Sequence, residues 1–255
     1  HAEFGPARNS SMTIANQIAA QTETLASAMV GAFQPAIANA YGAKDYERMK
    51  SLAFRACKFG TLLSAIFVLP LALELPTVLK IWLKEPPEYA AGLCWSILAM
   101  HLIDRTATGH MLAVAATGKI ALYQAFLGGS LILTLPIAWL LVRLHWGIYA
   151  TGWAMILTMM LCAWGRVWLA RTIAGMSAWY WVKKIFLPLV ILFVLVLVVG
   201  WLPRLWLQEG LLRVGVTTIL CELVLIGLAW VGVLDGREKE VVIQKWLNLK
   251  ERFSK

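Results

Sequence analysis

Residues 13–40 read TIANQIAAQTETLASAMVGAFQPAIANA, and this stretch decides how the chain is interpreted. At the 3.6-residue period of a helix, apolar side chains recur along one stripe and polar side chains along another. The apolar stripe holds Ile14, Ile18, Leu25, Met29 and Ala36; the polar stripe holds Thr13, Gln17, Gln21 and Thr24, with Asn16, Glu23, Ser27 and Gln34 beside it. One face suits lipid or protein core, and the other suits a water-filled cavity. A soluble-type surface helix, or one lying flat on a membrane, would show the same pattern.

The chain as a whole is unusually apolar. Of its 255 residues 60% are hydrophobic and 15% charged, and its mean hydropathy is +0.71. Soluble domains are about 45–50% apolar and about 25% charged. A soluble globule could not hide this much apolar surface. The composition excludes a disordered chain, a coiled coil, a nucleic-acid arm and a secreted disulfide scaffold, and it predicts an all-α polytopic membrane helix bundle.

The apolar runs are long enough to cross a membrane several times. A hydrocarbon core about 30 Å thick needs about 20 helical residues, and backbone groups there must be paired within the helix. We predict seven transmembrane helices, at 13–39, 54–74, 90–116, 120–142, 148–170, 184–202 and 212–234. Prolines 70 and 76, on either side of Glu74, should kink or end the second helix early. Residues 77–83 should then lie in the interface.

The basic residues fall mainly on one side of the predicted spans. The formal net charge is +9, which in a soluble protein would indicate a nucleic-acid partner. Here the basic residues lie between apolar runs, so they predict how the chain is oriented in the membrane, and no nucleic-acid partner is expected. Most basic residues lie on one side: Lys44, Arg48, Lys50, Arg55, Lys58, Lys119, Arg166, Arg171, Lys183, Lys184 and those of the tail 235–255. Fewer lie on the other: Arg8, Lys80, Lys84, Arg143, Arg204 and Arg213. The C-terminus is therefore predicted to be cytoplasmic, with an amphipathic basic tail that either rests on an anionic leaflet or is solvated.

A polar cluster interrupts the third span at residues 101–110. At 100° per residue, His101, Asp104, Arg105 and Thr108 project to one side, and His110 projects to the other, so the two histidines should not share a metal. Charge inside a bilayer usually faces a cavity or a partner. Asp104 could couple transport to an ion while Arg105 meets an anionic ligand. Alternatively, an ion pair, through Glu23, holds this helix to a neighbour. Glu222, inside the last span, is expected to be a packing contact.

Three common motifs of enzymes are absent from the sequence. There is no phosphate-binding P-loop, no HExxH and no GxSxG. The four cysteines are far apart and form no CxxC pair, so neither a zinc site nor a disulfide framework is predicted. We therefore expect neither an enzyme nor a bound metal or cofactor, apart from coupling to H⁺ or Na⁺.

The order of several features resembles a known family. A polar helix runs into AIANAYGAKDYERM (36–49), followed by RACKF (55–59), LPL (69–71), VLKIWLK (78–84), PEY (87–89), LID (102–104), ATGKI (116–120) and YQ (123–124). Over most of residues 4–143 the chain resembles the C-terminal half of a bacterial polysaccharide flippase of the Wzx type. Those flippases belong to the multidrug/oligosaccharidyl-lipid/polysaccharide exporter superfamily.

The resemblance implies a division of the chain. Such flippases have twelve to fourteen helices in two bundles around a central cavity, and these seven would be the eighth to the fourteenth. Residues 1–12 would be the remnant of a truncated helix, 13–170 the five-helix C-terminal bundle, 171–234 two additional transmembrane helices and 235–255 the cytoplasmic tail. Without the other bundle, the chain alone is not expected to transport.

The resemblance also implies a function. The protein would flip oligosaccharide units linked to undecaprenyl pyrophosphate across the bacterial inner membrane, for surface polysaccharide such as the O-antigen of lipopolysaccharide, by alternating access. By helical position, the pyrophosphate would meet Arg8 and Arg105, and sugar hydroxyls would meet Asn16, Gln17 and Gln21. Glu23 or Asp104 would couple to the ion. Membrane lipids and the polysaccharide polymerase machinery are the other expected partners.

Three alternatives stay open at this point. A multidrug or cation exporter of the same superfamily would want a cavity rich in carboxylates and aromatic rings, whereas the polar helix is rich in amides and hydroxyls. A membrane-embedded glycosyl- or acyltransferase could use His101 and Asp104 as acid and base, without an accompanying nucleophile. An assembly scaffold would not depend on the polar helix.

Overall fold

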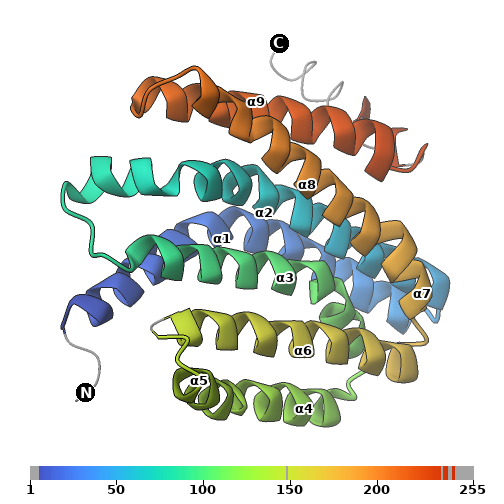
Figure 1. The fold of residues 1–255 in the computed structure, drawn as a ribbon. Helices are drawn as coiled ribbons and strands as arrows, with labels where there is room; N and C mark the ends of the chain where they lie inside the picture. Colours follow the sequence, from blue (N-terminus) through green and yellow to red (C-terminus); the bar gives the residue numbers. More distant parts are fainter. Residues whose placement is uncertain (1–5, 148, 237, 241–242, 245–255) are drawn as a thin grey trace.

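The computed structural model describes residues 6–147, 149–236, 238–240 and 243–244, without the side chains of residues 6–9, 19 and 25. Nearly all of the described residues are helical, which confirms the predicted all-α fold (Figure 1). The α-helices are α1 (Pro6–Gly42), α2 (Tyr46–Leu83), α3 (Ala90–Ala116), α4 (Ile120–Ile132), α5 (Thr134–Arg143), α6 (Tyr149–Ala174), α7 (Ala178–Trp181), α8 (Leu187–Trp201) and α9 (Leu211–Leu228). Two π-helices, η1 (Val182–Phe186) and η3 (Ala229–Val233), and a 3₁₀-helix, η2 (Leu202–Leu205), extend them.

Within the described residues, five helical segments are long and apolar enough to cross a membrane. They are Tyr46–Leu83, Ile120–Arg143, Tyr149–Ala174, Ala178–Leu205 and Leu211–Val233. The other two predicted spans correspond to α1 and α3, of 37 and 27 residues. Both exceed the length that a bilayer requires, and polar side chains interrupt their apolar runs. The chain is a multi-pass membrane protein in which α1 and α3 lie next to each other.

The helices pack side by side (Figure 1). Helix α1 packs against α2 and α3, α3 packs against α6, and α4 and α5 cover α6. Helices α8 and α9 pair with each other and lie on α2. A Cβ at Gly109 would clash with the carbonyl oxygen of Ala53, so glycine there permits the close approach of α3 to α2. This arrangement places the polar side chains of α1 within reach of α3.

The outer surface of α4, α5, α6, α8 and α9 is apolar. Large side chains such as Leu135, Val198, Ile219 and Val231 are exposed on it. Exposed apolar side chains on a transmembrane bundle meet acyl chains and carry no cost there. The lipid-facing surface is therefore distinct from the face on which α1 displays its polar residues.

Helix α2 passes through both of its prolines. Of the kink or early stop predicted at Pro70 and Pro76, the early stop is therefore wrong. Residues 77–83 continue the same helix. A proline cannot donate to the carbonyl four residues earlier, which for Pro76 is that of Ala72. The indole Nε1 of Trp95 on α3 donates to this carbonyl at 2.7 Å. The neighbouring helix thus satisfies the group that proline leaves unpaired, as is common in membranes.

Two other predicted spans are segmented near prolines. The fourth span is interrupted at Leu133, three residues before Pro136, and becomes α4 and α5. The sixth begins earlier than predicted, with α7, and enters α8 through the π-turn η1. There the N–H of Leu187 bonds to the carbonyl of Val182, just before Pro188. Such π-turns are frequent at functional sites.

Candidate functional site

Helix α1 has two contrasting faces. Side chains that point into the bundle are buried: Ser11, Ala15, Thr22, Ala26, Val30 and Ile37. The opposite face is exposed and carries Thr13, Asn16, Gln17, Gln21, Thr24 and Gln34. We call these six residues the polar face of α1. The three amides assigned to sugar hydroxyls, Asn16, Gln17 and Gln21, lie together on this face within two turns.

Glu23 lies at the edge of the polar face and turns toward α3. Its Oε1 accepts from Nδ1 of His101 at 2.6 Å and from a guanidinium nitrogen of Arg105 at 2.9 Å. The same nitrogen of Arg105 donates to Ser27 at 2.9 Å. The Glu23 side chain retains 28% of its exposure, whereas that of Arg105 retains 9%. We call these four residues the Glu23 cluster; it joins α1 to α3 and remains open on one side.

Asp104 points away from this cluster. Its Oδ1 accepts from Arg166 of α6 at 2.6 Å. The prediction that Asp104 and Arg105 project to one side is therefore wrong. Adjacent residues of a helix are about 100° apart, so Asp104 pairs with Arg166 of α6 whereas Arg105 pairs with Glu23 of α1. The ion pair through Glu23, the alternative that the sequence left open for this helix, is present, and Arg105 makes it.

Several polar atoms close to Arg166 are buried without a hydrogen-bond partner among the described residues. They are Nε of Arg166, Nε2 of His110 and the hydroxyl of Tyr123. His110 lies with its Nδ1 3.5 Å from Cys57 Sγ and its ring edge-on to Phe54 and Trp181. His110 thus packs away from His101, as predicted, and within the described residues no group of three or more His, Cys, Asp and Glu could hold a metal.

The burial of Glu74 and its partners on α9 were not predicted from the sequence. Glu74 of α2 is 1% exposed and accepts from Arg213 of α9 at 3.0 and 3.2 Å. Thr217 donates to it at 3.3 Å, and Arg204 lies 3.5 Å away. Arg213 also donates to Thr77 at 2.9 Å. We call these five residues the Glu74 cluster. The sequence did hold a signal for this pair, because an acid lies in the second predicted span and an arginine at the start of the seventh.

The structure says less about the other residues that the sequence singled out. Arg8 lies in the first turns of α1, but its side chain is outside the described part of the chain. Glu222 is partly buried in α9, and most of the tail, including 245–255, is outside the described residues.

One ion pair lies outside the membrane-spanning segments, at the end of α2. Lys80 donates to Glu209 at 2.9 Å, and this hydrogen bond lowers the pKa of the Glu209 carboxyl.

The comparison with known proteins bears on the same segment. The model of one family, described as MatE, matches residues 2–140. The chain belongs to the MatE family. No curated protein and no solved structure matches it. MatE proteins are membrane transporters, so this chain belongs to a transporter of the exporter superfamily that the sequence resembled.

The part matched to MatE contains the polar face of α1 and the Glu23 cluster. It spans α1, α2, α3 and α4 and most of α5. The partners of the other buried acids, Arg166 and Arg213, lie outside it. The exposed polar side chains and the partly open ion pair are therefore the candidate transport site.

Proposed function

We propose that this MatE chain serves to flip oligosaccharide units linked to undecaprenyl pyrophosphate across the bacterial inner membrane. The observation that carries the proposal is the chemistry of the polar face of α1. It consists of amides and hydroxyls, and the carboxylate at its edge, Glu23, is paired with His101 and Arg105. A cationic drug would need carboxylates free to meet its charge, whereas sugar hydroxyls need groups that both donate and accept.

In this proposal Asn16, Gln17 and Gln21 bind the glycan. Each amide offers two donors and a carbonyl acceptor, which match the mixed donor and acceptor character of a hydroxyl. Their exposure on successive turns supports a row of hydrogen bonds to a sugar chain lying along α1. A hydrated groove is needed because the glycan is too polar to cross hydrocarbon unaided.

Arg105 would bind the pyrophosphate by exchanging partners. It holds Glu23 and Ser27, and its buried Nε has no partner among the described residues. A phosphate group forms strong paired hydrogen bonds with a guanidinium and would compete with the carboxylate for it. Arg8, in the first turns of α1, is the second cation that we assign to this anion.

The exchange would link the substrate to an ion. A Glu23 carboxylate that lost Arg105 would take up a proton or Na⁺, and His101 at 2.6 Å could share the proton. Asp104 is the alternative coupling residue, but it would first have to leave Arg166. Both assignments use alternating access, in which the pathway opens to one side of the membrane at a time. The basic side, with the C-terminus, is cytoplasmic in this proposal.

Restoring the gene to a strain that lacks it tests the proposal. We expect Gln17→Leu combined with Gln21→Leu to abolish surface polysaccharide, because leucine removes the hydrogen bonds to the glycan. The matched control is Gln124→Leu, which alters an exposed glutamine of α4 and should leave polysaccharide unchanged. Immunoblotting shows that the variants are equally abundant. Rescue of drug resistance without rescue of polysaccharide would overturn the proposal in favour of a drug exporter.

A further inference from the structure

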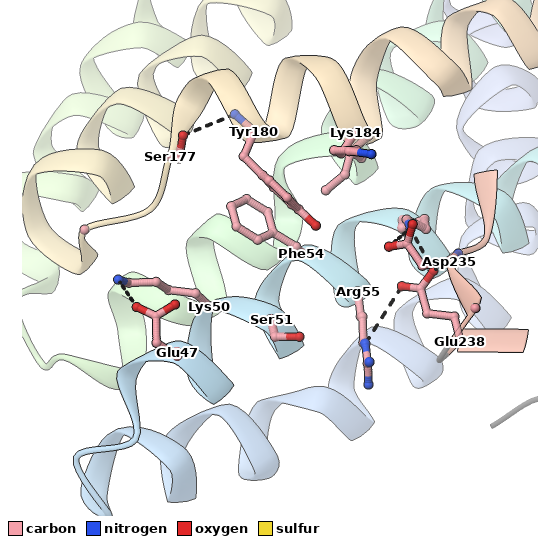
Figure 2. Close-up of a pocket in the computed structure, with 14 residues that line it drawn as sticks. Glu47, Lys50, Ser51, Phe54, Arg55, Ser177, Tyr180, Lys184, Asp235 and Glu238 are labelled. Atoms are coloured by element: carbon pink, nitrogen blue, oxygen red, sulfur yellow. Dashed lines mark hydrogen bonds and ion pairs between the residues drawn. The ribbon is translucent and has the colours of Figure 1, made fainter. Parts of the chain in front are cut away.

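A polar pocket lies where α2, the connection between α6 and α7, η1 and the segment after η3 meet (Figure 2). Its volume is about 770 Å³, within the range of sites for small ligands. Four cations and three acids line it: Lys50, Arg55, Lys58, Lys184, Glu47, Asp235 and Glu238. It lies far along α2 from Glu74, so it is separate from the Glu74 cluster.

The charges in the pocket are unevenly paired. Lys58 is neutralised by Glu238 at 2.8 Å and by Asp235 at 3.5 Å, and it also donates to the carbonyl of Val233 at 3.0 Å. Arg55 reaches Glu238 only at 3.8 Å, with Nε. Lys184 is exposed and has no ion pair among the described side chains. Positive charge without a close counterion therefore remains at Arg55 and Lys184.

The third acid does little to offset this charge. Glu47 pairs with Lys50 at 2.9 Å, but its side chain is 88% exposed, and pairs of this kind are weak in water. Ser51 adds a hydroxyl to the wall, and the rings of Phe54 and Tyr180 stand 4.8 Å apart beside it. The pocket thus offers cations, a hydroxyl and an apolar wall to one ligand.

The residues beside the pocket are those that gather at the level of the lipid headgroups. Trp179 and Tyr180 are exposed next to the pocket, and exposed Trp and Tyr gather at that level. Lys183 lies over the Trp179 ring at 4.7 Å, while its neighbour Lys184 lines the pocket. The surrounding segments carry most of the basic residues and are predicted to face the anionic cytoplasmic leaflet.

We propose that this pocket binds the phosphate of an anionic lipid headgroup, with Arg55 and Lys184 as its ligands. Basic pockets between transmembrane helices on the cytoplasmic side are suited to such headgroups. The chemistry would equally accept inorganic phosphate, so the test distinguishes the two. Glu238 competes with the lipid for Arg55. This inference concerns a lipid site at the membrane surface and stands whether or not the glycan proposal does.

Lipid binding to the purified 255-residue chain tests the inference. Native mass spectrometry in a neutral detergent would count bound phosphatidylglycerol, with phosphatidylcholine as the zwitterionic comparison. We expect Arg55→Gln and Lys184→Gln each to lower phosphatidylglycerol affinity about fivefold or more. Lys183→Gln removes the same charge one residue away and should leave the affinity unchanged. Glu238→Gln should raise the affinity, because it removes the competing acid.

Three results would overturn the inference. Equal losses in Lys183→Gln and Lys184→Gln would mean that general surface charge attracts the lipid. Equal binding of phosphatidylcholine and phosphatidylglycerol would remove the role of the headgroup charge. Inorganic phosphate that displaces phosphatidylglycerol at submillimolar concentration would make the ligand a soluble phosphate and the lipid assignment wrong.

Discussion

The Glu74 cluster and the Glu23 cluster both join an arginine to a carboxylate, but they differ in what surrounds them. The Glu74 cluster is closed: its acid is 1% exposed, and it joins α2 to α9. The Glu23 cluster is open: its acid keeps 28% of its side-chain exposure and lies beside the polar face of α1. Sealed ion pairs hold elements together, whereas a pair within reach of water can exchange partners. The contrast separates structural charges from candidate transport charges.

The largest expected effect is on stability, from Glu74→Gln. Arg213 would lose its charged partner while it remains buried, and breaking a buried pair costs about 3–5 kcal/mol. Denaturant unfolding of the purified protein would measure the change in the free energy of unfolding. Glu222→Gln, at a partly buried acid of α9, is the control and should change it little. A Glu74→Gln protein as stable as the wild type would show that the cluster does not hold α9.

Asp104→Asn should have an intermediate effect on stability. The asparagine can still accept from Arg166, but the neutral bond is weaker, and we expect a loss of about 1–3 kcal/mol. The same variant decides between the two coupling residues when export is measured in cells at matched abundance. Full export would remove Asp104 from the coupling mechanism and leave Glu23.

Of the variants at Glu74, Asp104 and Glu23, Glu23→Gln should reduce stability least and reduce export most. Because Glu23 is partly exposed, we expect the loss of the pair to cost about 1 kcal/mol. Export should fall at least tenfold, since a glutamine cannot exchange a proton. The test measures both the free energy of unfolding of the purified variant and the amount of polysaccharide that cells expressing it export. A destabilisation as large as that of Glu74→Gln with export intact would reverse the assignment of the two clusters.

The smallest effect is expected at Glu209. Its pKa is lowered by the hydrogen bond from Lys80, so the stabilisation it provides is present above the unfolded-state pKa and is lost as the pH falls. The pair is exposed, so Glu209→Gln should leave the melting temperature unchanged at pH 7. A clear drop at pH 7 that disappears at pH 4 would show that this connection holds α2 and the α8–α9 turn together.

The sequence predicted local features well because they depend on neighbouring residues. The amphipathic period of α1 and the apolar runs are such features, and the structure places helices at all of them. Features that depend on distant residues were missed. Pro76 stays within α2 because Trp95 supplies a donor, and Glu74 is buried because Arg213, 139 residues away, meets it. Likewise, only the positions of α1 and α6 decide where Asp104 and Arg105 point.

The reactivity of introduced cysteines tests the central claim, that the polar face of α1 borders water. Gln17→Cys and Gln21→Cys would be compared with Val194→Cys and Ile219→Cys, which are exposed on the apolar surface of α8 and α9. The native cysteines are buried and give little background. In membrane vesicles, the account predicts that a charged thiol reagent modifies the two α1 positions at least tenfold faster. Modification of Gln17→Cys and Gln21→Cys no faster than Val194→Cys would contradict it.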